Sequence, residues 1–282
     1  MSRLESAPKE LSIQLPDGRR LGYAEYGVPN GRPVLFFHGS LGSSYIHADM
    51  AEIAKQRSVR LIAVDRPGYG LSDSHAGRTF LTWADDIATL TDILGAKHFS
   101  IVGFSSGNPY ALACAYKLPD RVQMAALAGA LIPGVTEGIP PMMGQLYALA
   151  QTNPAELRKT IAAVAPSAVA LAEVAVAAVS DWDREVLNNR AAQFELEYSQ
   201  ALRQGTEGIA SDFIVFSGNW GFPIKEIKTE VHLWSGTQDQ NTPPAMTHYL
   251  ASQLPNSHIH VLQDEGHCAL YGHWDEILKC KA

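Results

Sequence analysis

The chain is poor in features that would place it in a specialised class of protein. Only three of its 282 residues are cysteines, and their spacing is that of neither a metal site nor a disulfide framework: Cys114, Cys268 and Cys280. Its lysines and arginines form no cluster, and its formal net charge is −7. We therefore expect no metal ion, no nucleic-acid partner and no binding to anionic membranes.

The chain also lacks a long uninterrupted apolar segment. The first ten residues, MSRLESAPKE, contain no apolar core, so we expect no secretory signal. The most apolar stretch, Ile161–Ser180, is interrupted by Pro166 and Glu173, which favours packed helices over a membrane span. With 46% hydrophobic and 18% charged residues, the composition is that of an ordinary soluble globular protein. We expect a cytoplasmic location.

Strand and helix patterns alternate along the first half of the chain. The segment Ser12–Gly27 is typical of a hairpin with its turn at Asp17-Gly18. Two continuous apolar runs, Pro33–Phe37 and Leu61–Val64, predict strands that are covered on both faces. A helical pattern over Phe80–Leu94 lies between such strands. This alternation predicts a parallel sheet with helices on both sides.

The alternation is interrupted after a further expected strand at Val122–Ala130. No strand pattern is evident from Pro133 to about Ile227, and the expected helices there include Gln145–Gln151, Ala155–Val164, Ala168–Val179 and Arg190–Gln204. Strands then return at Val231–Trp234 and His258–Leu262, with helices at Pro244–Leu254 and Tyr271–Leu278. We therefore expect a core formed by residues 1–132 and 228–282, with residues 133–227 inserted as a helical cap.

The segment His98–Ala115 contains the sequence that most directly suggests chemistry. A short strand pattern ends at residues 103–107 (GFSSG), and a helical pattern with Pro109 in its first turn follows. A serine at such a sharp turn is strained, and the residues two before and two after it need to be nearly free of side chains. Glycines hold both positions for Ser105, whereas a phenylalanine and an asparagine hold them for Ser106. The pattern predicts Ser105 as an exposed nucleophile.

A serine hydroxyl needs a base, normally a histidine oriented by a carboxylate. Catalytic groups in parallel sheets collect at the carboxyl ends of the strands. The loop after the expected strand 231–234 contains one acidic residue, Asp239, and the loop after strand 258–262 contains His267. The chain order Ser105, Asp239, His267 therefore predicts a catalytic triad.

Taken together, these segments resemble the α/β-hydrolase fold family. Besides the serine turn, the matching segments are His38–Gly42 (HGSLG), Asp65–Asp73 (DRPGYGLSD), residues 235–244 (SGTQDQNTPP) and Glu265–His267 (EGH). The resemblance covers nearly all of the chain outside the helical insertion. It implies an α/β fold with a mostly parallel central sheet, helices on both faces and an inserted α-helical cap. It also implies an oxyanion hole made by the backbone N–H groups of Ser40 and Ser106, with no cofactor.

Several nearby residues compete for these roles. Asp264 and Glu265 precede the histidine on the same loop, but such close neighbours rarely point at the ring nitrogen, which favours Asp239. His38 is expected to brace the oxyanion loop and not to react. Asn108 stands where the family often has a second glycine, and we expect its side chain to crowd or cap the start of the helix.

The expected reaction is hydrolysis of an ester-like acyl bond in a small, largely uncharged substrate through an acyl-enzyme. The candidate substrate-binding residues are Leu41, Met143 and Trp220. Alternatives on the same triad are cleavage of an amide at a peptide N-terminus and cleavage of a carbon–carbon bond. A peptidase needs carboxylates at the pocket, and the sequence does not place there any of Glu173, Glu195, Glu197 and Glu207. A ligand receptor that retains a hydrolase site is an alternative of another class, and no oligomeric state is indicated.

Overall fold

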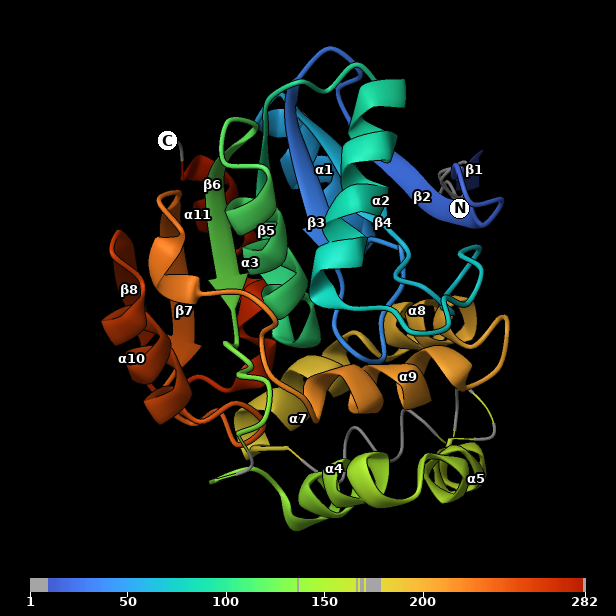
Figure 1. Cartoon of the computed structure of the whole chain (residues 1–282). Helices are drawn as coiled ribbons and strands as arrows, with labels where there is room; N and C mark the ends of the chain where they lie inside the picture. The colour runs from blue at the N-terminus through green and yellow to red at the C-terminus, as the bar shows by residue number, and fades with distance from the viewer. Residues whose placement is uncertain (1–9, 136, 166, 168–169, 171–178, 281–282) are drawn as a thin grey trace, which may run out of the picture.

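A computed structural model describes residues 10–135, 137–165, 167, 170 and 179–280 of the chain. Its centre is an eight-stranded sheet with the strand order β1-β2-β4-β3-β5-β6-β7-β8 (Figure 1). The strands are β1 Glu10–Gln14, β2 Arg20–Gly27, β3 Arg32–Phe37, β4 Val59–Val64, β5 Phe99–Phe104, β6 Val122–Ala128, β7 Glu230–Gly236 and β8 Ser257–Leu262. The β1–β2 and β2–β4 pairs are antiparallel, and every other pair is parallel. The expected mostly parallel α/β sheet is confirmed.

Helices cover both faces of this sheet. The buried aliphatic and aromatic residues of α2 (Phe80–Ile93), α3 (Asn108–Lys117) and α10 (Pro244–Gln253) belong to one core cluster. Those of α1 (Ala48–Gln56) and α11 (Leu270–Lys279) belong to another. In Figure 1, α2 and α3 lie in front of the strands, whereas α1 and α11 lie behind them.

Two adjacent residues of β3 show why the central strand is apolar throughout. Successive side chains of a strand point to opposite faces. The ring of Phe37 makes an edge contact with Trp83 of α2 at 5.2 Å between centroids, and that of Phe36 makes one with Trp274 of α11 at 5.6 Å. Both tryptophans are fully buried. The strand therefore needs apolar side chains in both alternating positions.

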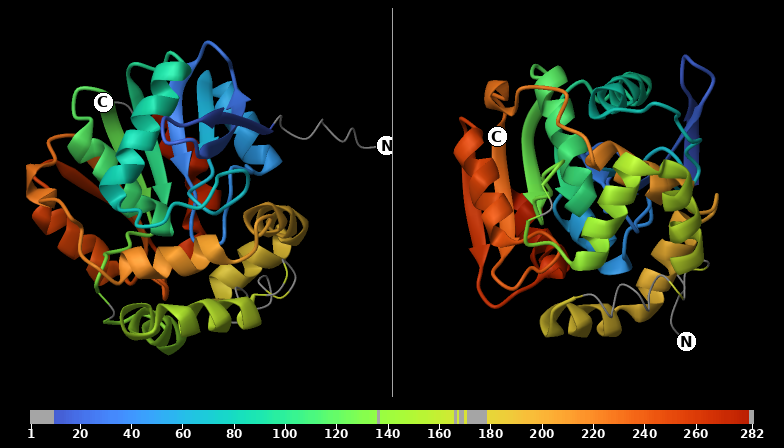
Figure 2. Two further views of the ribbon diagram at one scale, coloured as in Figure 1. Left: turned by 45° about the vertical axis from the view of Figure 1, so that its right-hand side comes forward. Right: turned by 60° about the horizontal axis from the view of Figure 1, so that its bottom comes forward.

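Among the described residues between β6 and β7, helices form and strands do not. They are α4 Pro141–Thr152, α5 Pro154–Val164, α7 Asp181–Asn189, α8 Ala191–Ala201 and α9 Glu207–Phe216. Figure 1 and the left view of Figure 2 show them beyond the arrowheads of β6 and β7, where the parallel strands end. None of the helices in the described part of the chain is long and apolar enough to cross a membrane.

The inserted helices differ in detail from the sequence prediction. The expected helix at Ala168–Val179 lies outside the described residues. The helix expected at Arg190–Gln204 is shorter, and two helices that we did not predict, α7 and α9, lie on either side of it. A capping signal marks α7, because the Ser180 hydroxyl accepts a hydrogen bond from the Asp183 backbone N–H. The hairpin and the helix from Phe80 are confirmed.

Candidate functional site

The tight turn that we expected around Ser105 is present between β5 and α3. Ser105 adopts a positive φ of 51°, which is unfavourable for a residue with a side chain. A methyl group added at Gly107 would overlap the carbonyl oxygen of Phe37, and one added at Gly103 would lie 2.7 Å from Oδ1 of Asn108. A side chain at position 107 would therefore collide with the backbone, and one at position 103 would displace the Asn108 side chain, so both positions favour glycine as the sequence rule states. The turn leaves the Ser105 side chain partly exposed.

Asn108 plays a different part from the one expected. It neither crowds nor caps the start of α3, because its side-chain amide points back to the sheet. Nδ2 donates hydrogen bonds to the carbonyl oxygens of Ala128 (3.0 Å) and Gly129 (2.7 Å) at the end of β6. Gly129 has a φ of +61°, and a methyl group there would lie 2.8 Å from Cε1 of His267. Asn108 therefore fixes the backbone that leaves room for the histidine ring.

Asp239 and His267, expected on neighbouring loops, are in direct contact. The Oδ2 atom of Asp239 lies 2.9 Å from Nδ1 of His267. The other oxygen accepts backbone hydrogen bonds from Asn241 (2.9 Å) and Thr242 (2.8 Å), and the Thr242 hydroxyl donates to Oδ2. Asp239 is only 4% exposed. These bonds hold the Asp239 carboxylate against the imidazole.

The environment of His267 adjusts its basicity. Burial lowers the pKa of the ring, but the charge of Asp239 and the hydrogen bond to it outweigh that effect. The net result is a pKa above the ordinary histidine value. A raised pKa makes the neutral ring a stronger proton acceptor, which suits a general base.

The two competing acids lie elsewhere. The carboxylate of Glu265 contacts His273, with its oxygens 2.9 and 3.0 Å from Nε2 of that ring. Asp264 is at a positive φ of 60°, and its backbone N–H donates to the Thr237 hydroxyl. The structure therefore brings Asp239, and neither of these, to His267.

A fully buried histidine braces the loop after β3. Nδ1 of His38 donates to the Gly39 carbonyl oxygen at 2.7 Å, and Nε2 accepts from the Arg66 backbone N–H at 3.0 Å. Burial and the charge of Arg66 lower the pKa of His38 well below its ordinary value. The ring is thus neutral and occupied on both nitrogens. It positions the segment Gly39–Ser40, which lines the same cavity as Ser105.

Arg66 extends this brace to the serine turn. Its guanidinium is fully buried, and Nη2 donates to the Gly39 carbonyl oxygen (3.0 Å) and to the Ser106 hydroxyl (2.9 Å). One buried cation therefore joins the two segments that hold Ser40 and Ser106. The hydroxyl of Ser106 is occupied by this contact, and the residue is 1% exposed.

The counter-charge for Arg66 comes from the helical insertion. Asp212 of α9 is 1% exposed and contacts Nη1 of Arg66, with a further ion pair to Arg78. The hydroxyl of Tyr69 lies 2.7 Å from both Oδ2 of Asp212 and the carbonyl oxygen of Ser40. The helix contains two acids, Glu207 and Asp212, and its local sequence does not show which of them is buried.

A second insertion helix positions the segment that contains His267. Asp183 of α7 accepts a hydrogen bond from the Cys268 backbone N–H at 2.6 Å and one from the Ser180 hydroxyl at 2.7 Å. A methyl group at Gly266 would overlap the Asp183 carboxylate. The glycine that precedes His267 therefore makes room for this anchor, which the sequence analysis missed.

A cavity of about 670 Å³ opens onto these residues. Ser40, Ser105 and His267 lie in its wall, together with Leu41. The five insertion helices that the structure describes all contribute to it, through Met143, Ile161, Leu187, Phe194 and Phe213 among others. Leu41 and Met143 both line the cavity, and their contact with a substrate stays a prediction.

The expectation for Trp220 is wrong. This residue is not among those that line the cavity. Its ring packs instead against Phe80 of α2, at 6.3 Å between centroids, and against Phe222, at 5.8 Å. An aromatic residue in a helical insertion can serve either the core or the pocket, and the sequence pattern does not separate the two.

One carboxylate lies in the largely apolar wall of the cavity. Glu197 of α8 is 6% exposed, and its Oε2 lies 3.1 Å from Nε2 of His47 and 3.4 Å from the Tyr271 hydroxyl. Glu197 is one of the four acids considered for a peptidase pocket, and the sequence alone does not show which of them reaches the cavity. No lysine or arginine is among the described residues that line the cavity.

Comparison with known proteins gives a consistent result. A family profile described as the alpha/beta hydrolase fold matches residues 32–273. The chain is 29% identical to a 2-hydroxymuconate semialdehyde hydrolase of Pseudomonas sp. (strain CF600), over 88% of this chain and 82% of the relative. It is 34% identical to a proline iminopeptidase of Xylella fastidiosa (strain 9a5c), over 44% of this chain and 41% of the relative.

Among solved structures, the chain is similar to the enol-lactonase from Burkholderia xenovorans LB400. The TM-score is 0.73 at 20% identity, and the match covers 95% of this chain and 97% of the other. At this identity the likeness concerns the fold alone.

Proposed function

The chain belongs to the alpha/beta hydrolase fold family, and on this basis we propose that it is a serine hydrolase that cleaves ester-like acyl bonds. The observation that carries the proposal is that Ser105 and His267 line one cavity, with the Asp239 carboxylate 2.9 Å from the far nitrogen of the histidine. The three residues come from different loops of the sheet: Ser105 follows β5, Asp239 follows β7 and His267 follows β8.

In the proposed reaction, Ser105 is the nucleophile and His267 is the base. Nε2 of His267 takes the hydroxyl proton as Oγ attacks the substrate carbonyl carbon, and the C=O π electrons move to oxygen. Asp239 stabilises the resulting imidazolium. The imidazolium then protonates the leaving alkoxide as the C–O bond breaks, which leaves an acyl-serine. Water, activated by the same ring, hydrolyses the acyl-serine and restores the free enzyme.

The negative charge on the substrate oxygen requires donors that are already in place. We assign them to the backbone N–H groups of Ser40 and Ser106, one on each segment held by Arg66. Because both segments bind one buried guanidinium, their separation is fixed before the substrate arrives. Such preorganised donors act without reorganisation during the reaction.

The cavity wall favours neutral substrates. Its described residues are mainly aliphatic and aromatic, include no lysine or arginine and include one buried carboxylate, Glu197. An anionic group would meet no fixed cation and would lie near a carboxylate, at a cost in desolvation. A small ester with an apolar acyl chain suits this wall. We propose residues 133–227 as a lid domain that sets this preference.

Carbon–carbon bond hydrolysis is the second candidate. The observation in its favour is the similarity to the 2-hydroxymuconate semialdehyde hydrolase, which extends over 88% of the chain. The same triad could serve both reactions, because each requires a nucleophile, a proton carrier and an oxyanion site.

A substrate panel with the purified full chain separates the candidates. It consists of p-nitrophenyl esters of increasing acyl length, amino-acid p-nitroanilides and a vinylogous 1,5-diketone that releases a carboxylic acid on C–C cleavage. We expect multiple turnovers and the highest kcat/KM with a neutral ester. A higher kcat/KM for the diketone or the anilides would reject ester specificity. A single burst without further turnover would indicate a receptor, and Ser105→Ala is the blank for every substrate.

A further inference from the structure

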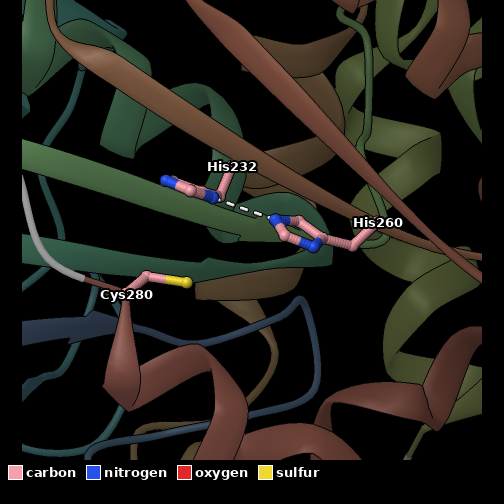
Figure 3. Close-up of side chains that lie close together, drawn as sticks. All are labelled: His232, His260 and Cys280. Carbon is pink, nitrogen blue, oxygen red and sulfur yellow. Dashed lines mark hydrogen bonds between the residues drawn. The ribbon is translucent and has the colours of Figure 1, made fainter.

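Three residues that could bind a metal ion lie close together outside the cavity described above. They are His232 on β7, His260 on β8 and Cys280, which directly follows α11 (Figure 3). Nδ1 of His232 lies 2.9 Å from Nε2 of His260, and one ligand atom from each of the three residues lies within 4.8 Å of the others. All three side chains are half-buried.

We propose that these residues bind a transition-metal ion of the zinc class through two imidazole nitrogens and one thiolate. Histidine nitrogen and cysteine sulfur are the ligands that Zn²⁺ prefers, at about 2.0–2.1 and 2.3 Å. Two nitrogens at these lengths from a tetrahedral ion are roughly 3.3 Å apart. The observed 2.9 Å needs only a small outward movement of the rings. The site does not depend on the proposed hydrolase reaction.

The surroundings hold the two rings in place. The ring of His260 stacks on that of Trp234 at 4.0 Å between centroids, with an interplanar angle of 9°. Oε1 of Glu230 lies 3.3 Å from Nε2 of His232, but the angle is not that of a hydrogen bond. A carboxylate there favours the tautomer with a proton on Nε2, which leaves the Nδ1 lone pair facing His260.

Binding can be written with a complete proton balance. Without an ion, the N–H group at Nε2 of His260 donates a hydrogen bond to Nδ1 of His232. When the ion binds, the His260 proton moves to Nδ1 of the same ring, so both facing nitrogens present lone pairs. The Cys280 thiol loses its proton to solvent and becomes the thiolate ligand. One proton is released for each ion bound, and no redox change occurs.

The position of the site indicates a structural role. Cys280 follows the last residue of α11, and α11 starts at Leu270, three residues after His267. An ion bound here would connect the end of this helix to β7 and β8. It would close a loop that contains the segment with His267, and an ion that binds only the folded chain stabilises that chain.

The spacing of the ligands explains why the sequence gave no indication of them. The two histidines are 28 residues apart, on neighbouring parallel strands. The cysteine directly follows α11, a helix that packs on one face of the sheet. Motif rules recognise ligands that are close together in the chain, whereas these meet only through the fold.

The test uses the tag-free full chain, with Zn²⁺ alone as the probe. Calorimetric titration gives the stoichiometry and the proton release, and reaction with a thiol reagent reports on Cys280. That thiol is half-buried, whereas Cys114 and Cys268 are buried, so the rapid phase belongs to Cys280. The variants are His260→Ala, Cys280→Ser and Glu230→Gln. The control is His248→Ala, at an exposed histidine on α10.

We expect one Zn²⁺ per chain, protection of the Cys280 thiol by Zn²⁺ and a higher Tm. The His260→Ala and Cys280→Ser variants should lose about 10–100-fold or more in affinity, Glu230→Gln at least about 10-fold, and His248→Ala nothing. Co²⁺ should give a sulfur-to-cobalt charge-transfer band that Cys280→Ser removes. The absence of saturable Zn²⁺ binding, or equal binding by His260→Ala and Cys280→Ser with folded circular-dichroism spectra, would overturn the proposal.

Discussion

The substitution Asp212→Asn tests whether the buried charge network joins the helical insertion to the core. Asp212 is the counter-ion of Arg66 and Arg78, and the exposed fractions of the three side chains are 1%, 0% and 3%. Asparagine keeps the shape of aspartate and can still accept hydrogen bonds, so the variant removes the charge and little else. Two guanidinium groups then remain in a buried site without their carboxylate.

The expected cost is large compared with the total stability. Breaking a buried ion pair by removing one partner costs about 3–5 kcal/mol, because the remaining charge is uncompensated. A domain typically has only about 5–15 kcal/mol of stability in all. In domains of about 150–250 residues, each kcal/mol of lost stability lowers Tm by roughly 2–4 °C. On that scale, Tm of the Asp212→Asn variant should fall by about 6–20 °C.

Thermal and urea unfolding, followed by circular dichroism, measure this effect. The matched control is Asp85→Asn, which removes an aspartate from a surface pair with Lys117 whose side chains are 60% and 38% exposed. Such a pair contributes less than about 1 kcal/mol. Equal stability losses in the two variants would refute the argument that the Asp212 site is shielded from solvent.

Three further predictions concern activity. Asp239→Asn should lower kcat by up to ~10⁴, as when an orienting carboxylate is lost, whereas Glu265→Gln should have little effect; the reverse order would reject the assignment. Because Asp239 raises the pKa of His267 and the neutral ring is the base, kcat/KM should fall as the pH drops through a value above ~6.5, and a flat profile from pH 5 to 8 would contradict this. Met143→Ala should change the relative kcat/KM for short and long acyl chains by ~1–3 kcal/mol, and Trp220→Ala should not; a change in Trp220→Ala alone would place the pocket elsewhere.

The strands and turns of this chain depend on residues that are close together in the sequence, which is why the sequence predicts much of the fold. The apolar runs of β3 and β4 identify buried strands because both faces of the sheet are covered. The turn at Ser105 is predicted because glycines flank it at positions 103 and 107, where a side chain would crowd neighbouring atoms. Similarly, Asp239 and His267 could be paired because both follow strands that end at one edge of the sheet.

The residues that the sequence analysis missed act across long distances in the chain. Asp212 is 146 positions from Arg66, and Asp183 is 85 positions from Cys268. No local pattern shows which acid on an insertion helix will be buried against the core. The error at Trp220 has the same origin, since it lies in the segment after α9, and the sequence does not show whether such a residue packs on the core or lines the cavity.

The central claim is that Ser105 is the nucleophile, and active-site labelling tests it most directly. The purified chain is treated with a fluorophosphonate, and the modified residue is located by peptide mass spectrometry in the wild type, Ser105→Ala and Ser106→Ala. We expect one label per chain on Ser105, none on Ser105→Ala and continued labelling of Ser106→Ala, whose backbone N–H is unchanged. Undiminished labelling of Ser105→Ala, or a label on Ser106 in the wild type, would contradict the account.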